Sequence, residues 1–206
     1  MTKSAPIVIA ALLVLAAAGG AVYGLSAGAA PAAAPAAAPA TAPSPARAGR
    51  PLSLDEAIRE LNLVKPSRQK YAEDFTLKLA EGGTFRLADQ RGKVVLVNFW
   101  ATWCPPCREE MPAMQRLYDR HKARGLVLVA VSLDADPALV PPYVKASKLT
   151  FPIALDPKAE VGNKYGVRAL PSSFVVDKHG KMTALALGPR VWDNDASHAL
   201  VDALLR

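Results

Sequence analysis

Apolar residues along the chain follow two patterns that predict a β-sheet. Residues 93–99 (KVVLVNF) and 126–133 (LVLVAVSL) are continuous apolar runs rich in β-branched residues, typical of strands buried on both faces. Residues 75–87 (FTLKLAEGGTFRL) alternate apolar and polar positions around a Gly-Gly turn, and residues 172–187 (SSFVVDKHGKMTALAL) hold two apolar runs around a polar turn. We therefore predict two central strands and two β-hairpins.

Helical segments separate these strands. Residues 104–125 predict a helix that ends at a glycine, because apolar residues recur there at helical spacing: Met111, Met114, Leu117 and Tyr118. Residues 136–149 predict a helix that is broken or restarts near Pro141 and Pro142. Residues 151–156 (FPIALD) predict a short strand and residues 158–166 a short helix.

Residues 193–206 predict a terminal helix with one apolar face, capped by Asp193 or Asn194. Strands that alternate with helices indicate the α/β class. We therefore expect a mixed central sheet with helices on both faces.

The N-terminal end of the chain has a different composition. Residues 7–25 form an uncharged apolar run of nineteen residues that follows Lys3. This length predicts a membrane anchor in residues 1–28, and a cleaved signal sequence stays open because small residues (SAGAA) follow the run. Lys3 predicts a cytoplasmic N-terminus, with the remainder of the chain exported.

Two further segments precede the predicted α/β domain. Residues 29–50 form an Ala/Pro-rich linker in which recurrent prolines block a stable helix and favour extended backbone. Residues 51–70 contain SLDEAIRELN, which predicts a short helical lead-in. Residues 71–206 are long enough for a single hydrophobic core, and we assign them to one domain.

The formal net charge of +7 raises the question of a nucleic-acid partner. The Lys and Arg residues are scattered, however, and form no dense basic run. We therefore predict a solvated basic surface and no nucleic-acid partner.

Both cysteines of the chain, Cys104 and Cys107, lie in one C-x-x-C motif, which is typical of either a metal site or a redox couple. Structural zinc needs four ligands, and the chain has no second motif of this kind. His121 at a helix end, His179 in a hairpin turn and His198 on a polar helix face are all expected on the surface. We predict no resident metal, although the two thiolates suit transient Cu(I) binding.

The position of the motif favours redox chemistry. A disulfide across two intervening residues removes little chain entropy, so a purely structural bridge here would stabilise weakly. Cys104 lies at the predicted start of a helix, where the dipole and free N–H groups lower a thiol pKa. We predict that Cys104 attacks a partner and that Cys107, one turn further along, resolves the mixed disulfide. Export also favours an oxidised pair.

Several motifs together resemble one family. The resemblance is carried by WCPPC directly after VVLVNFWAT, by DFTL before it, and by YGVRALPSSFVVDKHGK and GPRVW after it. With these motifs the chain resembles the TlpA-like (ResA-like) thiol–disulfide oxidoreductases of the thioredoxin superfamily. The resemblance covers residues 74–206. It implies a thioredoxin fold with an N-terminal β-hairpin and a helix/strand insert, and it implies no cofactor.

The resemblance also implies a cellular role. Such an enzyme would be tethered at the periplasmic face of the inner membrane and would reduce disulfides of exported proteins, with apocytochrome c or a copper-site protein as candidate partners. A membrane thiol donor would return it to the dithiol state. Two alternatives stay open: a copper-binding or metal-delivery module that uses the same thiols, and a peroxiredoxin-like peroxidase, because DFTL and GKVVLVNFWATW also resemble that sister family.

Individual site residues follow from the same resemblance. Pro171 matches the cis-proline that lies against the disulfide and presents backbone to a partner, with Leu170 before it and Trp103 beside the cysteines. Leu170 stands where Thr or Val often precedes this proline. Pro112 matches a proline that kinks the active-site helix.

An acidic residue completes the predicted site. Glu110, three residues after Cys107, matches the carboxyl that this branch keeps near its cysteines. Burial would raise the pKa of this carboxyl and allow it to relay protons. Asn98 occupies the position of the buried Asp of ordinary thioredoxins, so that proton relay is absent and Glu110 gains importance.

Overall fold

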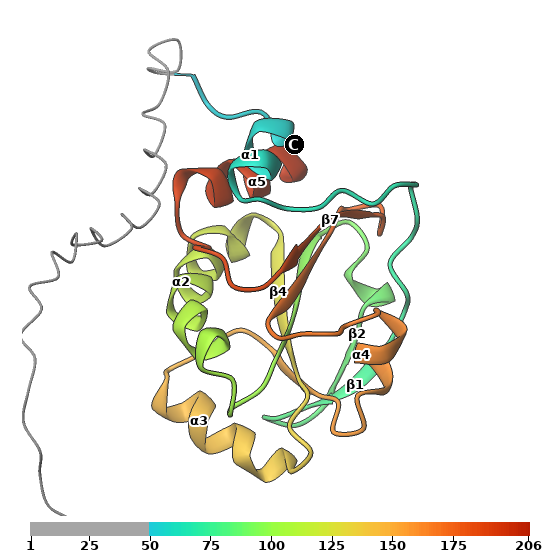
Figure 1. Cartoon of the computed structure of the whole chain (residues 1–206), viewed down its shortest axis with the longest axis vertical. Coiled ribbons are helices and arrows are strands. Elements are labelled where there is room, and N and C mark those ends of the chain that lie inside the picture. Colours follow the sequence, from blue (N-terminus) through green and yellow to red (C-terminus); the bar gives the residue numbers. More distant parts are fainter. Residues whose placement is uncertain (1–49) are drawn as a thin grey trace, which may run out of the picture. The chain divides into compact units, whose positions relative to one another are not determined.

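The computed structural model describes residues 50–206 (Figure 1). The anchor predicted in residues 1–28, and all but the last residue of the predicted linker, lie outside this part of the chain. None of the helices within residues 50–206 has the length and apolar character required to span a bilayer.

The described residues form one seven-stranded sheet in the order β2-β1-β5-β4-β3-β6-β7. Its strands are β1 (Thr76–Leu79), β2 (Thr84–Arg86), β3 (Val94–Trp100), β4 (Leu126–Ser132), β5 (Ile153–Leu155), β6 (Ser172–Val176) and β7 (Met182–Leu187). Strands β3, β4 and β5 are parallel neighbours, and the other pairings are antiparallel. The mixed sheet and both predicted hairpins are therefore confirmed.

The helices of this part are α1 (Leu54–Glu60), α2 (Pro105–His121), α3 (Val140–Ala146), α4 (Glu160–Lys164) and α5 (Asp195–Leu205). Asn194, and not Asp193, caps α5, because its side chain accepts a hydrogen bond from the Ser197 N–H. Helix α3 begins after a 3₁₀ turn (Pro137–Leu139), so its two prolines lie in the first turn, where a missing N–H costs no helical hydrogen bond.

Helices cover both faces of the sheet, as predicted, and β3 shows why six of its seven residues are apolar, with Asn98 as the exception. Alternate residues point to opposite faces of a strand. Val94 and Leu96 join a core with residues of α1, α2, α3 and α5, whereas Val95 and Val97 join a second core on the α4 side. All seven residues of β3 are buried.

The segment predicted as a helical lead-in contributes to the first of these cores. Helix α1 starts with a capping box between Ser53 and Glu56 and buries Ala57 and Ile58. It packs beside α5 (Figure 1). Beyond it, Val64 forms an antiparallel bridge with Leu185 of β7.

One surface prediction is wrong. His121 is 0 % exposed, because the C-terminal turn of α2 packs against α5. Its Nε2 lies 3.0 Å from Nδ1 of His198, which is itself half-buried on α5. A polar residue at a helix end gave no sign that another helix would cover it. His179 is exposed, as predicted.

Candidate active site

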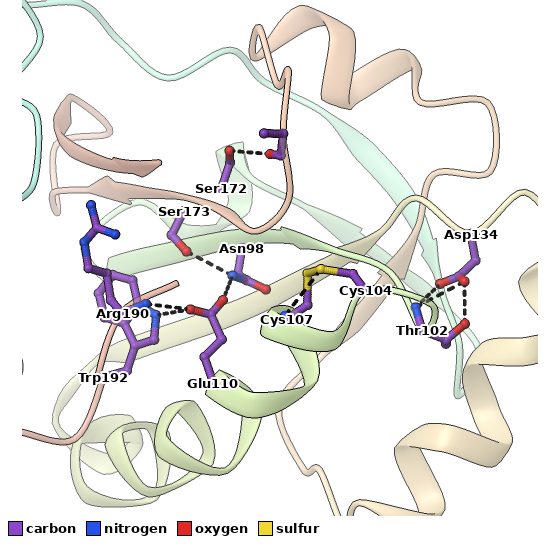
Figure 2. Close-up of a disulfide and its surroundings, with 11 residues drawn as sticks. Asn98, Thr102, Cys104, Cys107, Glu110, Asp134, Ser172, Ser173, Arg190 and Trp192 are labelled. Carbon is purple, nitrogen blue, oxygen red and sulfur yellow. Dashed lines mark hydrogen bonds between the residues drawn. A yellow bond between two sulfur atoms is a disulfide. The ribbon is translucent and has the colours of Figure 1, made fainter. Parts of the chain in front are cut away.

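The two cysteines meet where β3 passes into α2, and they form a disulfide with Cα atoms 5.3 Å apart (Figure 2). Cys104 is the N-cap of α2, and its Sγ accepts a hydrogen bond of 3.3 Å from the Cys107 N–H. Pro105 and Pro106 occupy the first turn, where no helical partner exists for their missing N–H groups. The sulfur of Cys104 therefore lies at the electropositive end of a seventeen-residue helix.

Exposure distinguishes the two sulfurs. Cys107 is 0 % exposed and Cys104 is 4 % exposed, whereas Trp103, next to Cys104, is 65 % exposed. An incoming thiol or disulfide can reach Cys104 more easily than Cys107. This difference is in the direction that the predicted roles of the two cysteines require.

A groove runs beside Cys104. The Leu170–Pro171 peptide bond is cis. The groove has a volume of about 490 Å³, and Trp103, Cys104, Val167, Arg168 and Leu170 are among its lining residues. Pro171 leads directly into β6, so the loop that borders the groove is held by the central sheet.

Glu110, on the second turn of α2, is 4 % exposed and accepts three hydrogen bonds. Its Oε1 accepts from Asn98 Nδ2 at 2.8 Å, and its Oε2 accepts from the Arg190 N–H at 3.0 Å and from Trp192 Nε1 at 3.1 Å (Figure 2). Burial raises the pKa of Glu110 to about 6, against the lowering effect of these hydrogen bonds. A carboxyl with this pKa exchanges protons near neutral pH.

Asn98 connects Glu110 to the sheet. Its Nδ2 donates to Glu110 Oε1 and, at 2.9 Å, to Ser173 Oγ on the neighbouring strand β6. Asn98 is 0 % exposed, and its Oδ1 has no hydrogen-bond partner in the described part of the chain.

Three residues of this site were missed by the sequence analysis. Arg190 and Trp192 belong to the GPRVW motif, whose presence supported the resemblance but indicated no role. Asp134, 2 % exposed, accepts hydrogen bonds from both the N–H and the hydroxyl of Thr102 and so holds the loop before Trp103 (Figure 2). The signal that could have found it is its position directly after the predicted strand of residues 126–133, at the sheet edge where the cysteines follow the neighbouring strand.

The remaining predicted position, Pro112, lies inside α2 beyond Glu110. No cluster of three or more His, Cys, Asp or Glu side chains within residues 50–206 is arranged to hold a metal ion. The structure thus brings Trp103, Cys104 and Leu170 together in the lining of one groove, with Cys107 bonded to Cys104 and Glu110 one turn further along α2. Pro171 follows Leu170 in the chain, after the cis peptide bond.

Comparison with known proteins agrees with this geometry. Residues 69–185 match the AhpC/TSA family. This chain belongs to the AhpC/TSA family. A thiol-disulfide oxidoreductase ResA from Geobacillus thermodenitrificans is 40 % identical over 127 residues, which cover 62 % of this chain and 73 % of that protein.

Solved structures of similar proteins show the same fold. A thiol:disulfide interchange protein of the thioredoxin family from Chlorobium tepidum shares 31 % identity with a TM-score of 0.60, over 68 % of this chain and 99 % of that one. StoA from Bacillus subtilis shares 34 % identity with a TM-score of 0.52, over 58 % of this chain and 91 % of that one. The thioredoxin fold and the ResA-like resemblance are confirmed, and this AhpC/TSA-family chain is a thiol–disulfide oxidoreductase.

Proposed function

We propose that the chain is an exported thiol–disulfide reductase, tethered at the periplasmic face of the inner membrane by residues 1–28. The observation that carries the reductase role is the disulfide at the N-terminus of α2, with one sulfur beside a groove and the other fully buried near Glu110. The apolar run of residues 7–25 supports the tether.

The reaction begins with the reduced enzyme. The thiolate of Cys104 attacks one sulfur of a partner disulfide, so that a Cys104–partner bond forms and the second partner sulfur leaves as a thiolate. Cys107 then attacks Cys104 Sγ, closes the enzyme disulfide and releases the first partner sulfur. The partner gains two electrons and becomes a dithiol, and the enzyme is left oxidised.

Cys104 suits the first step because of its place at the helix terminus. The Cys107 N–H donates to its Sγ, and the helix dipole favours a negative charge there. Both effects stabilise the thiolate that attacks.

Glu110 suits the second step. Cys107 must lose its proton before it attacks, and Glu110 lies one turn along the same helix. With a pKa of about 6, its carboxylate is the major form at pH 7 and can accept that proton. When a membrane thiol donor reduces the disulfide again, the same carboxyl returns it.

Partner proteins bind in the groove beside Cys104. The exposed ring of Trp103 offers apolar surface, and the backbone at Leu170, before the cis peptide bond, offers polar groups to an extended chain. The substrate class is exported proteins that contain a disulfide. The family resemblance makes apocytochrome c and a copper-site protein the candidates to test first.

Trapping of partners tests this proposal. In full-length Cys107→Ser, the mixed disulfide on Cys104 cannot be resolved, so partner proteins should accumulate as adducts that are visible on non-reducing gels. Cys104→Ser, the matched control, should trap none. If Cys104→Ser traps partners equally well, the assigned roles are wrong, and if neither variant traps any, the reductase function is wrong.

A further inference from the structure

The orientation of the Asn98 carboxamide is determined by its neighbours. A carboxylate accepts hydrogen bonds and cannot donate, so the group that faces Glu110 Oε1 at 2.8 Å must be the NH₂ of Asn98. The same NH₂ donates to Ser173 Oγ at 2.9 Å. Because Nδ2 is held by Glu110 of α2 and by Ser173 of β6, Oδ1 must face away from these two side chains.

The disulfide lies on the side that Oδ1 faces. Figure 2 shows the Asn98 carboxamide between Glu110 and the cysteine pair, with Oδ1 directed to the side of Cys107. Asn98 and Cys107 are both 0 % exposed, and Oδ1 accepts no hydrogen bond from the described residues. A buried acceptor without a donor costs free energy, so this arrangement calls for an explanation.

We propose that Asn98 is a positioning residue for Cys107, because its Oδ1 accepts a hydrogen bond from the Cys107 thiol once the disulfide is reduced. This inference rests on the proposed function for the assignment of Cys107 as the resolving thiol. It adds a second group to the carboxyl of Glu110, because the same amide that donates to this carboxyl accepts from the sulfur.

Reduction supplies the missing donor. A donor dithiol breaks the Cys104–Cys107 bond, delivers two electrons and leaves one hydrogen on each sulfur, while it closes to a disulfide itself. The sulfur of Cys107 is then no longer bonded to Cys104 and carries a hydrogen that it can donate. Among the described residues, Asn98 Oδ1 is a buried acceptor without a partner.

Two consequences follow for the reduced enzyme. The hydrogen bond stabilises the protonated form of Cys107, so Cys104 is the sulfur that ionises. The dithiol state also gains a hydrogen bond that the disulfide state lacks, which moves the redox equilibrium toward the dithiol. Asn98 therefore makes the enzyme a weaker reductant than it would be without the amide oxygen.

The reduction potential tests the second consequence. When the full-length protein is equilibrated with glutathione buffers, Asn98→Ala should lower the equilibrium constant for reduction about tenfold, which is about 30 mV toward more negative potential. Asn163→Ala, a change of the same residue type at an exposed position on α4, is the matched control and should leave it unchanged. An unchanged potential in a folded Asn98→Ala protein overturns the proposal.

The sign of the thiol titration tests the first consequence. Asn98→Ala removes the acceptor, so the pKa of Cys107 should fall, whereas Asn98→Asp keeps an acceptor oxygen and adds negative charge, so it should rise. A general loss of packing would not produce shifts of opposite sign. Shifts in the same direction for both variants would contradict the role of Oδ1.

A measurement without any change at Asn98 covers the case in which its variants do not fold. In Cys104→Ala, Cys107 is the sole thiol of the chain. Its S–H stretching band in a Raman spectrum should lie at lower frequency in the folded protein than in the same protein unfolded by urea. Equal frequencies would refute the hydrogen bond.

These results are separable from a failure of the proposed function. If wild-type protein traps no partner but the Raman band is shifted, the reductase role fails and the Asn98 contact stands. If partners are trapped and the band is not shifted, the function stands and the contact is refuted.

Discussion

Helix α2 has a buried polar cluster at each end. We expect the N-terminal cluster to act in disulfide exchange and the C-terminal cluster to stabilise the fold. At the N-terminal end lie Glu110 and Asn98, and at the C-terminal end lie His121 and His198. Burial favours the neutral form in both places, since it raises the pKa of Glu110 to about 6 and lowers the pKa of His121 and of His198.

The clusters differ in how completely they are paired. Both ring nitrogens of His121 have neighbours, with Nε2 at 3.0 Å from His198 and Nδ1 at 3.3 Å from Arg124 and 3.5 Å from Asp202. At the other end, Asn98 Oδ1 is left without a partner beside the disulfide. A fully paired cluster stabilises a helix contact, whereas an unpaired buried acceptor is typical of a site that changes during a reaction.

The largest effect is expected from Glu110→Gln. Glutamine keeps the size of the side chain but cannot take up a proton, so disulfide exchange should slow about 100-fold. The wild-type rate should also change with pH around 6, where Glu110 titrates, and the variant should lose that step. Stopped-flow measurement of disulfide reduction between pH 5 and pH 8 provides both results.

Glu109→Gln is the matched control for this experiment. Glu109 is the adjacent residue of α2 and is exposed, so its replacement should leave both the rate and the pH profile unchanged. Equal slowing by the two variants would mean that overall charge, and not a proton transfer by Glu110, is responsible.

His121→Ala should lower the stability of the protein and leave the rate of disulfide exchange unchanged. Removal of a fully buried side chain leaves a cavity and an unpaired His198, so the free energy of unfolding should fall by about 2 kcal/mol. The exchange rate of the folded protein should not change. Urea unfolding at pH 7.5 measures the first quantity, with exposed His179→Ala as the control. A slower exchange rate in His121→Ala would show that the two clusters are coupled.

The contributions of the two clusters to stability should change with pH in opposite directions. The histidine pKa values are lowered on folding, so their contribution is complete above the unfolded pKa of 6.5 and is lost as pH falls below it. The pKa of Glu110 is raised, so its contribution is present at low pH and is lost as pH rises through about 6.

A double variant separates these contributions. With His121→Gln and His198→Gln together, the loss of stability between pH 7.5 and pH 5 should disappear, and stability should rise toward pH 5 because of Glu110. Urea midpoints at the two pH values test this. A midpoint that still falls as in wild type would assign the acid sensitivity to other groups.

The smallest effect is expected at the surface of the redox end. Trp103→Ala removes an exposed ring from the groove beside Cys104, so the KM for a protein disulfide should rise about threefold, with kcat unchanged. Steady-state reduction of a disulfide-containing protein gives both constants. A change in kcat alone would place Trp103 in the exchange step and not in partner binding.

Local pattern was sufficient to predict most of the fold and the reactive pair. Six of the seven residues of β3 are apolar, and this run predicted a strand buried on both faces, whereas the C-x-x-C motif before a helical pattern predicted redox chemistry at a helix start. These predictions succeeded because period and motif spacing are properties of neighbouring residues, which the sequence displays directly.

The polar contacts were decided by tertiary structure. Glu110 is separated from Arg190 and Trp192 by 80 and 82 positions, and His121 from His198 by 77, so no local pattern could indicate that they meet. The burial of His121 and the unpaired oxygen of Asn98 likewise follow from which helix or strand covers each side chain. The sequence by itself therefore determined the elements and the two sulfurs, whereas packing of α2 against the sheet and α5 decided which polar groups lost water and which found partners.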